Sequence, residues 1–165
     1  MLNSKKPLEH YLQQYRFRKL LPFLQGSVLD FGGNEGELRP YVKGDYSIVN
    51  YDYSGLEGKQ FDTIVALAVI EHIEVTHVAE IFRMFKKMLA PGGQLFLTTP
   101  TAAAKPVLEM LAFTGILDKA NIAEHKHYWS RNELLTLASD SGFRVDKYEK
   151  FQLGFNQLAL LKHNN

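Results

Sequence analysis

The chain has 165 residues, of which 45% are hydrophobic and 22% charged, a length and composition that suit one soluble domain with a sizeable core. Its formal net charge of +1 gives no bulk attraction to nucleic acid or to an anionic membrane, and the absence of cysteine excludes disulfides, thiolate metal sites and a cysteine nucleophile. No apolar run approaches the ~20 residues that a membrane span needs, and the first residues lack the apolar centre of a signal peptide, so we expect a cytoplasmic protein.

The first third of the chain alternates between helical and strand patterns. Apolar side chains recur about every 3.6 residues over residues 7–25 and predict a helix that ends at Gly26. Behind it we expect, in order, a strand at 27–31, a glycine-rich turn, a short helix near 36–42 and a second strand at 46–51.

The middle of the chain carries the clearest patterns. Residues 61–68 form an apolar run around Asp62 and Thr63, which is typical of a central parallel strand. Residues 73–89 place their apolar side chains on one helical face and two lysines in the last turn, where cations favour the helix dipole. A Pro-Gly-Gly turn ends this helix, and residues 95–99 follow as the next strand.

The last third opens with an apolar segment and a capped helix. Residues 102–117 are apolar and predicted to be helical, whereas residues 118–128 have the pattern of a loop. Ser130 and Glu133 have the spacing of a capping box, so a helix begins there, and Gly142 ends it.

The order of these segments predicts an α/β fold of the Rossmann-like, doubly wound type. Alternating strands and helices favour a mostly parallel sheet that is covered on both faces. Two C-terminal strand patterns, at 143–151 and 155–162, most simply form an antiparallel pair. No repeat or linker divides the chain, so residues 1–165 are predicted to form a single domain that begins with a helix within residues 1–25.

The most informative segment runs from Val28 to Gly36, where an apolar strand ends in an acid and a glycine-rich turn follows. A buried strand that leads into such a turn makes a ligand site at the carboxyl edge of an open α/β sheet. The dinucleotide fingerprint has glycines at relative positions one, three and six, whereas here those positions hold Gly32, Asn34 and Glu37. A nicotinamide oxidoreductase is therefore an alternative that rests on fold analogy alone.

Four blocks of the sequence occur in an order that points to one family. They are Val28–Gly36, Phe61–Val65 with Val69–Ile73, Leu89–Leu95, and His127–Ser130 with Glu133–Leu134 and Ser141–Phe143. Each block is weak alone, but together they resemble the class I S-adenosylmethionine-dependent methyltransferases over roughly residues 20 to 163. The resemblance implies methyl transfer from S-adenosyl-L-methionine to an acceptor that the sequence does not identify.

The resemblance also implies the residues that hold this cofactor. Asp30 would take the amino group, the glycine loop the methionine part and ribose, Asp52 the two ribose hydroxyls, and Tyr53 would lie against adenine. From the residues alone, the two aspartates could instead cap turns and Tyr53 could be a packed surface aromatic. The implied cofactor residues are Asp30, Gly32, Gly33, Asn34, Gly36, Asp52, Tyr53 and Ala68.

Two features depart from the family pattern. Asn34 stands where the loop usually has its middle glycine, and Asn is among the few residues that tolerate a left-handed backbone. Only residues 53–61 separate Asp52 from Asp62, too few for the helix and third strand that the family places there. We therefore expect a sheet that lacks one edge strand of the usual seven, and with it the acid that usually contacts adenine.

Two histidines are the predicted catalytic residues. Methyl transfer from a sulfonium is an in-line displacement in which the protein aligns donor and acceptor, and a hydroxyl acceptor benefits from a general base. His72 follows the central strand at the carboxyl edge, and His127 lies in the loop before the last helix. Packing at a helix start and a loop hydrogen bond are their alternative roles. The histidine spacing matches no paired-ligand helix signature, so no metal site is expected.

The sequence thus predicts methylation of a small molecule, at oxygen, with residues 101–128 covering the acceptor. An apolar stripe in that segment would pack internally or, if exposed, form a homodimer interface. The alternative from another class is a methyltransferase-like binding or regulatory protein without catalysis, which predicts a buried Asn34 and a collapsed pocket. Nucleic acid and a membrane are not expected as partners.

Overall fold

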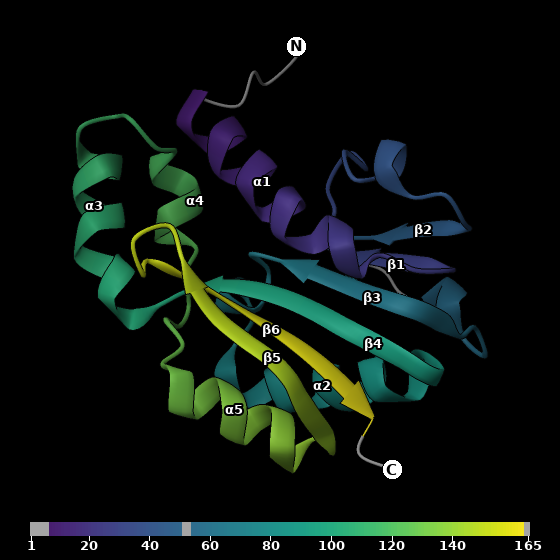
Figure 1. Cartoon of the computed structure of the whole chain (residues 1–165). Helices are drawn as coiled ribbons and strands as arrows, with labels where there is room; N and C mark the ends of the chain where they lie inside the picture. The colour runs from purple at the N-terminus through teal and green to yellow at the C-terminus, as the bar shows by residue number, and fades with distance from the viewer. Residues whose placement is uncertain (1–6, 51–53, 164–165) are drawn as a thin grey trace.

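A single twisted sheet organises the computed structural model, which describes residues 7–50 and 54–163 (Figure 1). Within these residues six strands lie in the order β2-β1-β3-β4-β6-β5. They are β1 (Val28–Phe31), β2 (Tyr46–Val49), β3 (Phe61–Leu67), β4 (Leu89–Pro100), β5 (Phe143–Phe151) and β6 (Asn156–His163). Strands β1 to β4 pair in parallel, whereas β6 is antiparallel to both β4 and β5. The predicted α/β fold with an antiparallel C-terminal pair is confirmed.

Five α-helices accompany the sheet in the described part of the chain. They are α1 (Pro7–Leu20), α2 (Val75–Met88), α3 (Lys105–Phe113), α4 (Lys119–Ala123) and α5 (Arg131–Asp140). Short 3-10 turns connect some of these elements, at Leu21–Phe23, Arg39–Tyr41, Ser54–Leu56, Ile70–His72 and Ala102–Ala104.

Helices cover both faces of the sheet because its central strands are apolar on both sides. Side chains alternate between the two faces along a strand. Ile64 of β3 therefore packs into one core with Phe82 of α2 and Leu134 of α5, whereas the next residue, Val65, packs into a second core with Leu20 of α1. Figure 1 shows the same arrangement, with α1 on one face and α2 and α5 on the other.

Strand β2 is the outer strand on its side of the described sheet. It pairs only with β1, with Tyr46 opposite Val28, and the chain then passes through the turn at Ser54–Leu56 into β3. The six strands of the described residues, one fewer than the usual seven, confirm the predicted loss of one edge strand. As a result, the outer side of β2 is not flanked by a further strand in the described residues.

Two helix predictions in the first third of the chain were wrong in extent. The helix predicted over residues 7–25 ends at Leu20, because Pro22 has no N–H to continue the α-helical hydrogen bonds. The helix predicted near 36–42 is only a 3-10 turn at Arg39–Tyr41. Asn34 and Gly36 have positive φ angles of 52° and 81°, a backbone that cannot continue into a right-handed helix.

Three predictions in the later part were also incomplete. The helix predicted over residues 102–117 is a 3-10 turn followed by α3, which ends at Phe113, shortly before Gly115 with its φ of 78°. The loop predicted at 118–128 contains α4, whose start is held by Asp118, since its carboxylate accepts from the Ala120 N–H at 2.8 Å. The strand predicted at 95–99 is the core of β4, which begins at Leu89 opposite Phe61. The Pro-Gly-Gly segment therefore belongs to an irregular start of the strand.

Candidate functional site

A cleft of about 1440 Å³ opens at the carboxyl ends of the parallel strands. Its walls come from the glycine loop after β1, from residues 67–73 after β3, from one face of α1 and from the segment that contains α4. Parallel strands place their carboxyl ends at one edge, and ligands of open α/β sheets bind there. The cleft is therefore where the sequence places the site.

Asp30 supplies a buried carboxylate at the base of this cleft. The residue is the last but one of β1, is only 4% exposed, and accepts a hydrogen bond of 2.6 Å from the Tyr46 hydroxyl. Burial raises the pKa of Asp30 to about 6, with the hydrogen bond from Tyr46 opposing the shift and the charge of Glu37 adding to it. A cationic ligand group stabilises the charged form of such a buried acid, so this position favours binding of a cation.

Gly32 and Gly33 are required by the packing of the loop itself. A Cβ on Gly33 would lie 2.3 Å from Cγ of Asp30, and one on Gly32 would lie 2.5 Å from a methyl carbon of Val69. Gly32 also has a φ of 79°, which L side chains rarely adopt. The two glycines thus let the loop lie directly on the Asp30 carboxylate and on the residues after β3. Both line the cleft.

Asn34 and Asn50 hold the tip of the glycine loop. The Asn34 N–H donates to Oδ1 of Asn50 at 2.8 Å, and Nδ2 of Asn50 donates back to the Asn34 carbonyl at 2.9 Å. Only the backbone of Asn34 takes part, and its side chain is exposed. Asn50 lies just beyond β2, and the sequence offered no motif that singles it out. Gly36 supports the turn but does not line the cleft.

Ala68 has an unusual backbone conformation at the end of β3. It follows β3 with a φ of 57°, donates its N–H to the Thr98 carbonyl at 2.9 Å, and lines the cleft. A non-glycine residue in this region of the backbone is uncommon. Asp52 and Tyr53, the predicted ribose and adenine contacts, lie outside the described residues.

A polar cluster of Glu71, His72 and His125 forms the far wall of the cleft. Glu71 and His72 lie in the turn after β3, and His125 follows α4. The rings of His72 and His125 meet edge to face, with centroids 4.7 Å apart. Glu71 is fully buried and accepts from the Thr99 hydroxyl at 3.0 Å. Chemistry-bearing side chains from two distant segments therefore meet at one place.

Burial dominates the electrostatics of this cluster. It raises the pKa of Glu71 to about 7, and it lowers the pKa of His125 to about 4, with the charges of His72 and Arg16 adding to the second shift. It also lowers the pKa of His72. Both imidazoles are therefore neutral at neutral pH and hold a free nitrogen lone pair.

Arg16 is a contributor that the sequence reasoning missed. It reaches the cleft from α1, where burial lowers the pKa of its guanidinium and the charge of Glu71 acts in the opposite direction. Within the basic run at residues 16–19 no local signal distinguishes it from its neighbours. Only the packing of α1 against the sheet turns this one cation inward.

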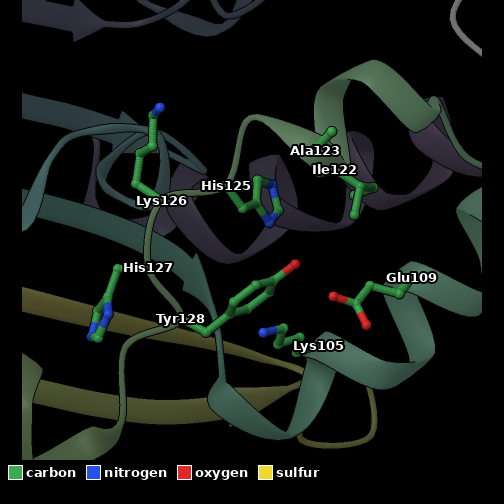
Figure 2. Close-up of a pocket in the computed structure, with 8 residues that line it drawn as sticks. All are labelled: Lys105, Glu109, Ile122, Ala123, His125, Lys126, His127 and Tyr128. Carbon is green, nitrogen blue, oxygen red and sulfur yellow. The ribbon is translucent and has the colours of Figure 1, made fainter.

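His127 lies elsewhere. Its Nε2 is 3.2 Å from Oε1 of Glu133, its ring meets Trp129 edge to face, and it does not line the cleft. His127 contributes to a smaller pocket of about 410 Å³ instead. Figure 2 shows that His125 and Tyr128 lie close together at this pocket, while the His127 ring points away from both. Of the two predicted catalytic histidines, the structure brings His72 into the cleft.

A model of a protein family, described as a methyltransferase domain, matches residues 8–148. The chain belongs to this methyltransferase family. The prediction of a methyltransferase is confirmed. The comparison with curated proteins found no match.

Solved structures show that this methyltransferase shares its fold with several others. An O-methyltransferase family protein from Burkholderia thailandensis has a TM-score of 0.67 at 15% identity, over 93% of this chain and 57% of that one. The PH0226 protein from Pyrococcus horikoshii OT3 has a TM-score of 0.62 at 16% identity, over 92% and 91%. The glycopeptide N-methyltransferase MtfA, complexed with S-adenosyl-L-methionine, has 0.65 at 12% identity, over 92% and 87%.

The methyltransferase is short beside some of these structures and spans 57% of the Burkholderia protein. Identities of this size show the fold alone. None of the helices in the described part of the chain is long and apolar enough to cross a membrane.

Proposed function

We propose that this methyltransferase transfers a methyl group from S-adenosyl-L-methionine to a hydroxyl oxygen of a small molecule. The observation that carries the proposal is one continuous cleft that joins Asp30 and the glycine loop to the cluster of Glu71, His72 and His125. A donor and an acceptor can therefore lie in line, one at each end, and such alignment is the main contribution of a protein to this reaction.

The donor end suits the methionine part of the cofactor. Asp30 offers a buried carboxylate to the ammonium group, and Gly32 and Gly33 leave the backbone of the loop uncovered beside it. When bound, S-adenosyl-L-methionine supplies an electrophilic methyl group on a sulfonium that leaves as a neutral thioether. Asn34, Gly36 and Ala68 keep the loop and the strand end in the shape that this fit requires.

The acceptor end suits a hydroxyl group. His72 lines the cleft and can accept the hydroxyl proton, whereas His127 is bonded to Glu133 outside it, so we assign the role of base to His72. Apolar side chains of the covering segment, Leu108, Leu117 and Ile122, line the same cleft and favour an acceptor with an apolar part.

The short segment 53–61 and Asn34 motivate the alternative of a non-catalytic binding protein, but two observations in the described residues count against it. That alternative predicts a buried Asn34 and a collapsed pocket. Asn34 is exposed, and the cleft beside it holds about 1440 Å³.

Calorimetric titration with S-adenosyl-L-methionine and with its demethylated product tests the donor site. Gly33→Ala drives a Cβ into the Asp30 carboxylate and should abolish binding, whereas Gly55→Ala adds a Cβ with nothing within 4 Å and should bind like the natural chain. Absence of binding at millimolar ligand would refute the proposed cofactor.

The acceptor is tested with methyl-labelled cofactor and a set of phenols, carboxylic acids and amines. We expect label on a phenolic or alcoholic oxygen, and His72→Ala to lower the rate by about 10²–10⁴-fold, as for loss of a general base. Label only on nitrogen would contradict the oxygen assignment.

A homodimer and a cytoplasmic location stay predictions. Met110 and Phe113 of α3 are exposed by 57% and 86%, and they are the place where a second copy would bind. Sedimentation velocity of the natural chain and of Phe113→Asp distinguishes a dimer through this surface from a monomer.

A further inference from the structure

We propose that Glu71, His72 and His125 bind one divalent transition-metal ion at the acceptor end of the cleft. The sequence led us to expect no metal, because the histidine spacing matches no paired-ligand helix signature. The fold removes that objection, since donor atoms of all three side chains lie within 4.8 Å of one another. Ligands bound to one ion at about 2.0–2.2 Å lie ~3–3.5 Å apart, so each side chain needs to move by only about 1 Å.

Two of the three side chains each have a buried polar atom that has no hydrogen-bond partner among the described residues. Oε1 of Glu71 and Nδ1 of His125 are buried and have no hydrogen-bond partner. A buried carboxylate oxygen without a partner is costly, and such groups are normally paired or bound to a metal. The nearby Arg16 guanidinium attracts Glu71 electrostatically but leaves Oε1 without a hydrogen bond.

The surroundings orient these donors in the way that metal sites require. The backbone of Glu124 interacts with the His72 ring, and an imidazole that has one outer partner still has a second nitrogen to offer a metal. The Thr99 hydroxyl holds Oε2 of Glu71 at 3.0 Å and so directs the free Oε1 away from it. A ligating histidine and carboxylate in proteins have such outer partners almost without exception.

The backbone fixes the third donor to the first two. The Glu71 carbonyl accepts from the N–H groups of Lys126 and His127 at 2.7 and 3.3 Å. The loop that carries His125 is therefore attached directly to the turn that carries Glu71 and His72. This attachment makes the cluster a preorganised unit, although its members come from distant segments.

The donor set indicates the kind of metal. Two neutral imidazoles and one carboxylate suit Zn²⁺ and the other first-row divalent ions, whereas Mg²⁺ and Ca²⁺ prefer sites made of oxygen alone. His72 and His125 are only half-buried and line the cleft, so a bound ion keeps open positions on that side. Open positions are the mark of a catalytic metal.

The role of the ion rests on the proposed function. A metal-bound acceptor hydroxyl loses its proton to solvent or a nearby base more readily than a free one. Its oxygen then forms the new bond to the methyl carbon while the carbon–sulfur bond breaks, and the electron pair of that bond stays on sulfur. In this arrangement the ion orients and activates the acceptor in place of the His72 base, because the nitrogen of His72 that would accept the proton is then a metal ligand.

The experiment measures metal binding without cofactor or acceptor, so that it can fail independently of the methyl transfer. The full chain, freed of metal with a chelator, is titrated with Zn²⁺ by calorimetry and with Co²⁺ by visible absorption. We expect one ion per chain, a Co²⁺ spectrum with nitrogen ligation, and no comparable binding of Mg²⁺.

Variants identify the ligands. His125→Ala and Glu71→Gln should weaken Zn²⁺ binding by at least ~100-fold, and Thr99→Val, which removes only the outer hydrogen bond, by about 10- to 100-fold. His77→Ala is the control, because this exposed histidine lines the same cleft outside the cluster and should bind Zn²⁺ normally. Circular dichroism confirms that each variant is folded.

Three results would overturn the proposal: no Zn²⁺ binding by the natural chain, undiminished binding by folded His125→Ala and Glu71→Gln, or equal binding of Mg²⁺. Metal binding without any binding of S-adenosyl-L-methionine would leave the site in place and refute the proposed function instead.

Discussion

Single side chains at the base of the cleft owe their properties to their surroundings. Asp30 follows an apolar strand in the sequence, but its pKa of about 6 comes from its burial and from contact with Tyr46 and the glycine loop. Asn34 departs from the family pattern, yet its side chain is exposed, and its backbone conformation serves the same turn as a glycine. The residue types allow a charged group and a left-handed turn at these positions, and the packing of their neighbours determines the pKa of Asp30 and the role of Asn34.

Asp30 should make the stability of the protein fall as the pH rises. Its pKa is 3.8 in the unfolded chain and about 6 in the fold, so between these values the folded state holds a proton that the unfolded state releases. Relative to the natural chain, Asp30→Asn should therefore gain about 2 kcal/mol of unfolding free energy between pH 4.5 and pH 7.5. Urea denaturation at both pH values measures the difference, and a difference independent of pH would contradict the assigned pKa.

Substitution of Asn50 should destabilise the glycine loop more than substitution of Asn34. Asn50→Ala removes both hydrogen bonds to the loop and should cost about 1–2 kcal/mol of unfolding free energy. Asn34→Gly keeps both bonds, because they involve only backbone atoms, and glycine accepts a φ of 52°. It should therefore be neutral or slightly stabilising. Equal losses in the two variants would show that the Asn34 side chain matters after all.

At the scale of elements, local signals succeeded where they were strong. The apolar face of α2 and the capping box of α5 are encoded by neighbouring residues, and both helices are found where they were expected. The helix expected near 36–42 failed because the left-handed residues before it belong to the ligand loop. Helix α4 was missed because it is only five residues long and has no apolar period.

The capping box should contribute measurably to α5. The Ser130 hydroxyl accepts from the Glu133 N–H at 3.3 Å, and the Glu133 carboxylate accepts from the Ser130 N–H at 2.8 Å. Ser130→Ala should lower the unfolding free energy by about 1 kcal/mol. Ser139→Ala, at an exposed position in the same helix, should be within a few tenths of a kcal/mol of the natural chain. Chemical denaturation of both variants checks the contrast, which would be absent if the box were not formed.

At the scale of the whole molecule, the sheet decides which distant residues meet. Its parallel strands bring the carboxyl ends of β1, β3 and β4 to one edge. On the far side of β4 the sheet continues with β6 and then β5. Gln157 illustrates the coupling, since its buried side chain donates to the Trp129 carbonyl at 2.6 Å and accepts from the Tyr148 hydroxyl at 2.9 Å. The loop that carries the cleft histidine is thus tied to both C-terminal strands.

Phe82 should be among the side chains on which the whole fold depends. It is fully buried and meets Phe143 edge to face at 6.1 Å, which joins α2 to the start of β5. Phe82→Ala should cost about 3–5 kcal/mol, a large share of the 5–15 kcal/mol typical of a domain. Leu153→Ala truncates a side chain that is 96% exposed and should cost less than ~0.5 kcal/mol. Urea unfolding curves distinguish the two, and similar losses would contradict the assigned core.

The sequence by itself determined the family, the parallel sheet with its antiparallel end, the missing edge strand and the position of the glycine loop. These features follow from the period of the apolar residues, the number of residues between elements and the positions of the glycines. All three can be read from residues that are close together in the chain. Only the tertiary structure decided that Arg16 and His125 face the cleft, that His127 does not, and that Glu71 meets two imidazoles. Such contacts depend on how helices and loops pack across the edge of the sheet, and the spacing of residues along the chain does not predict that packing.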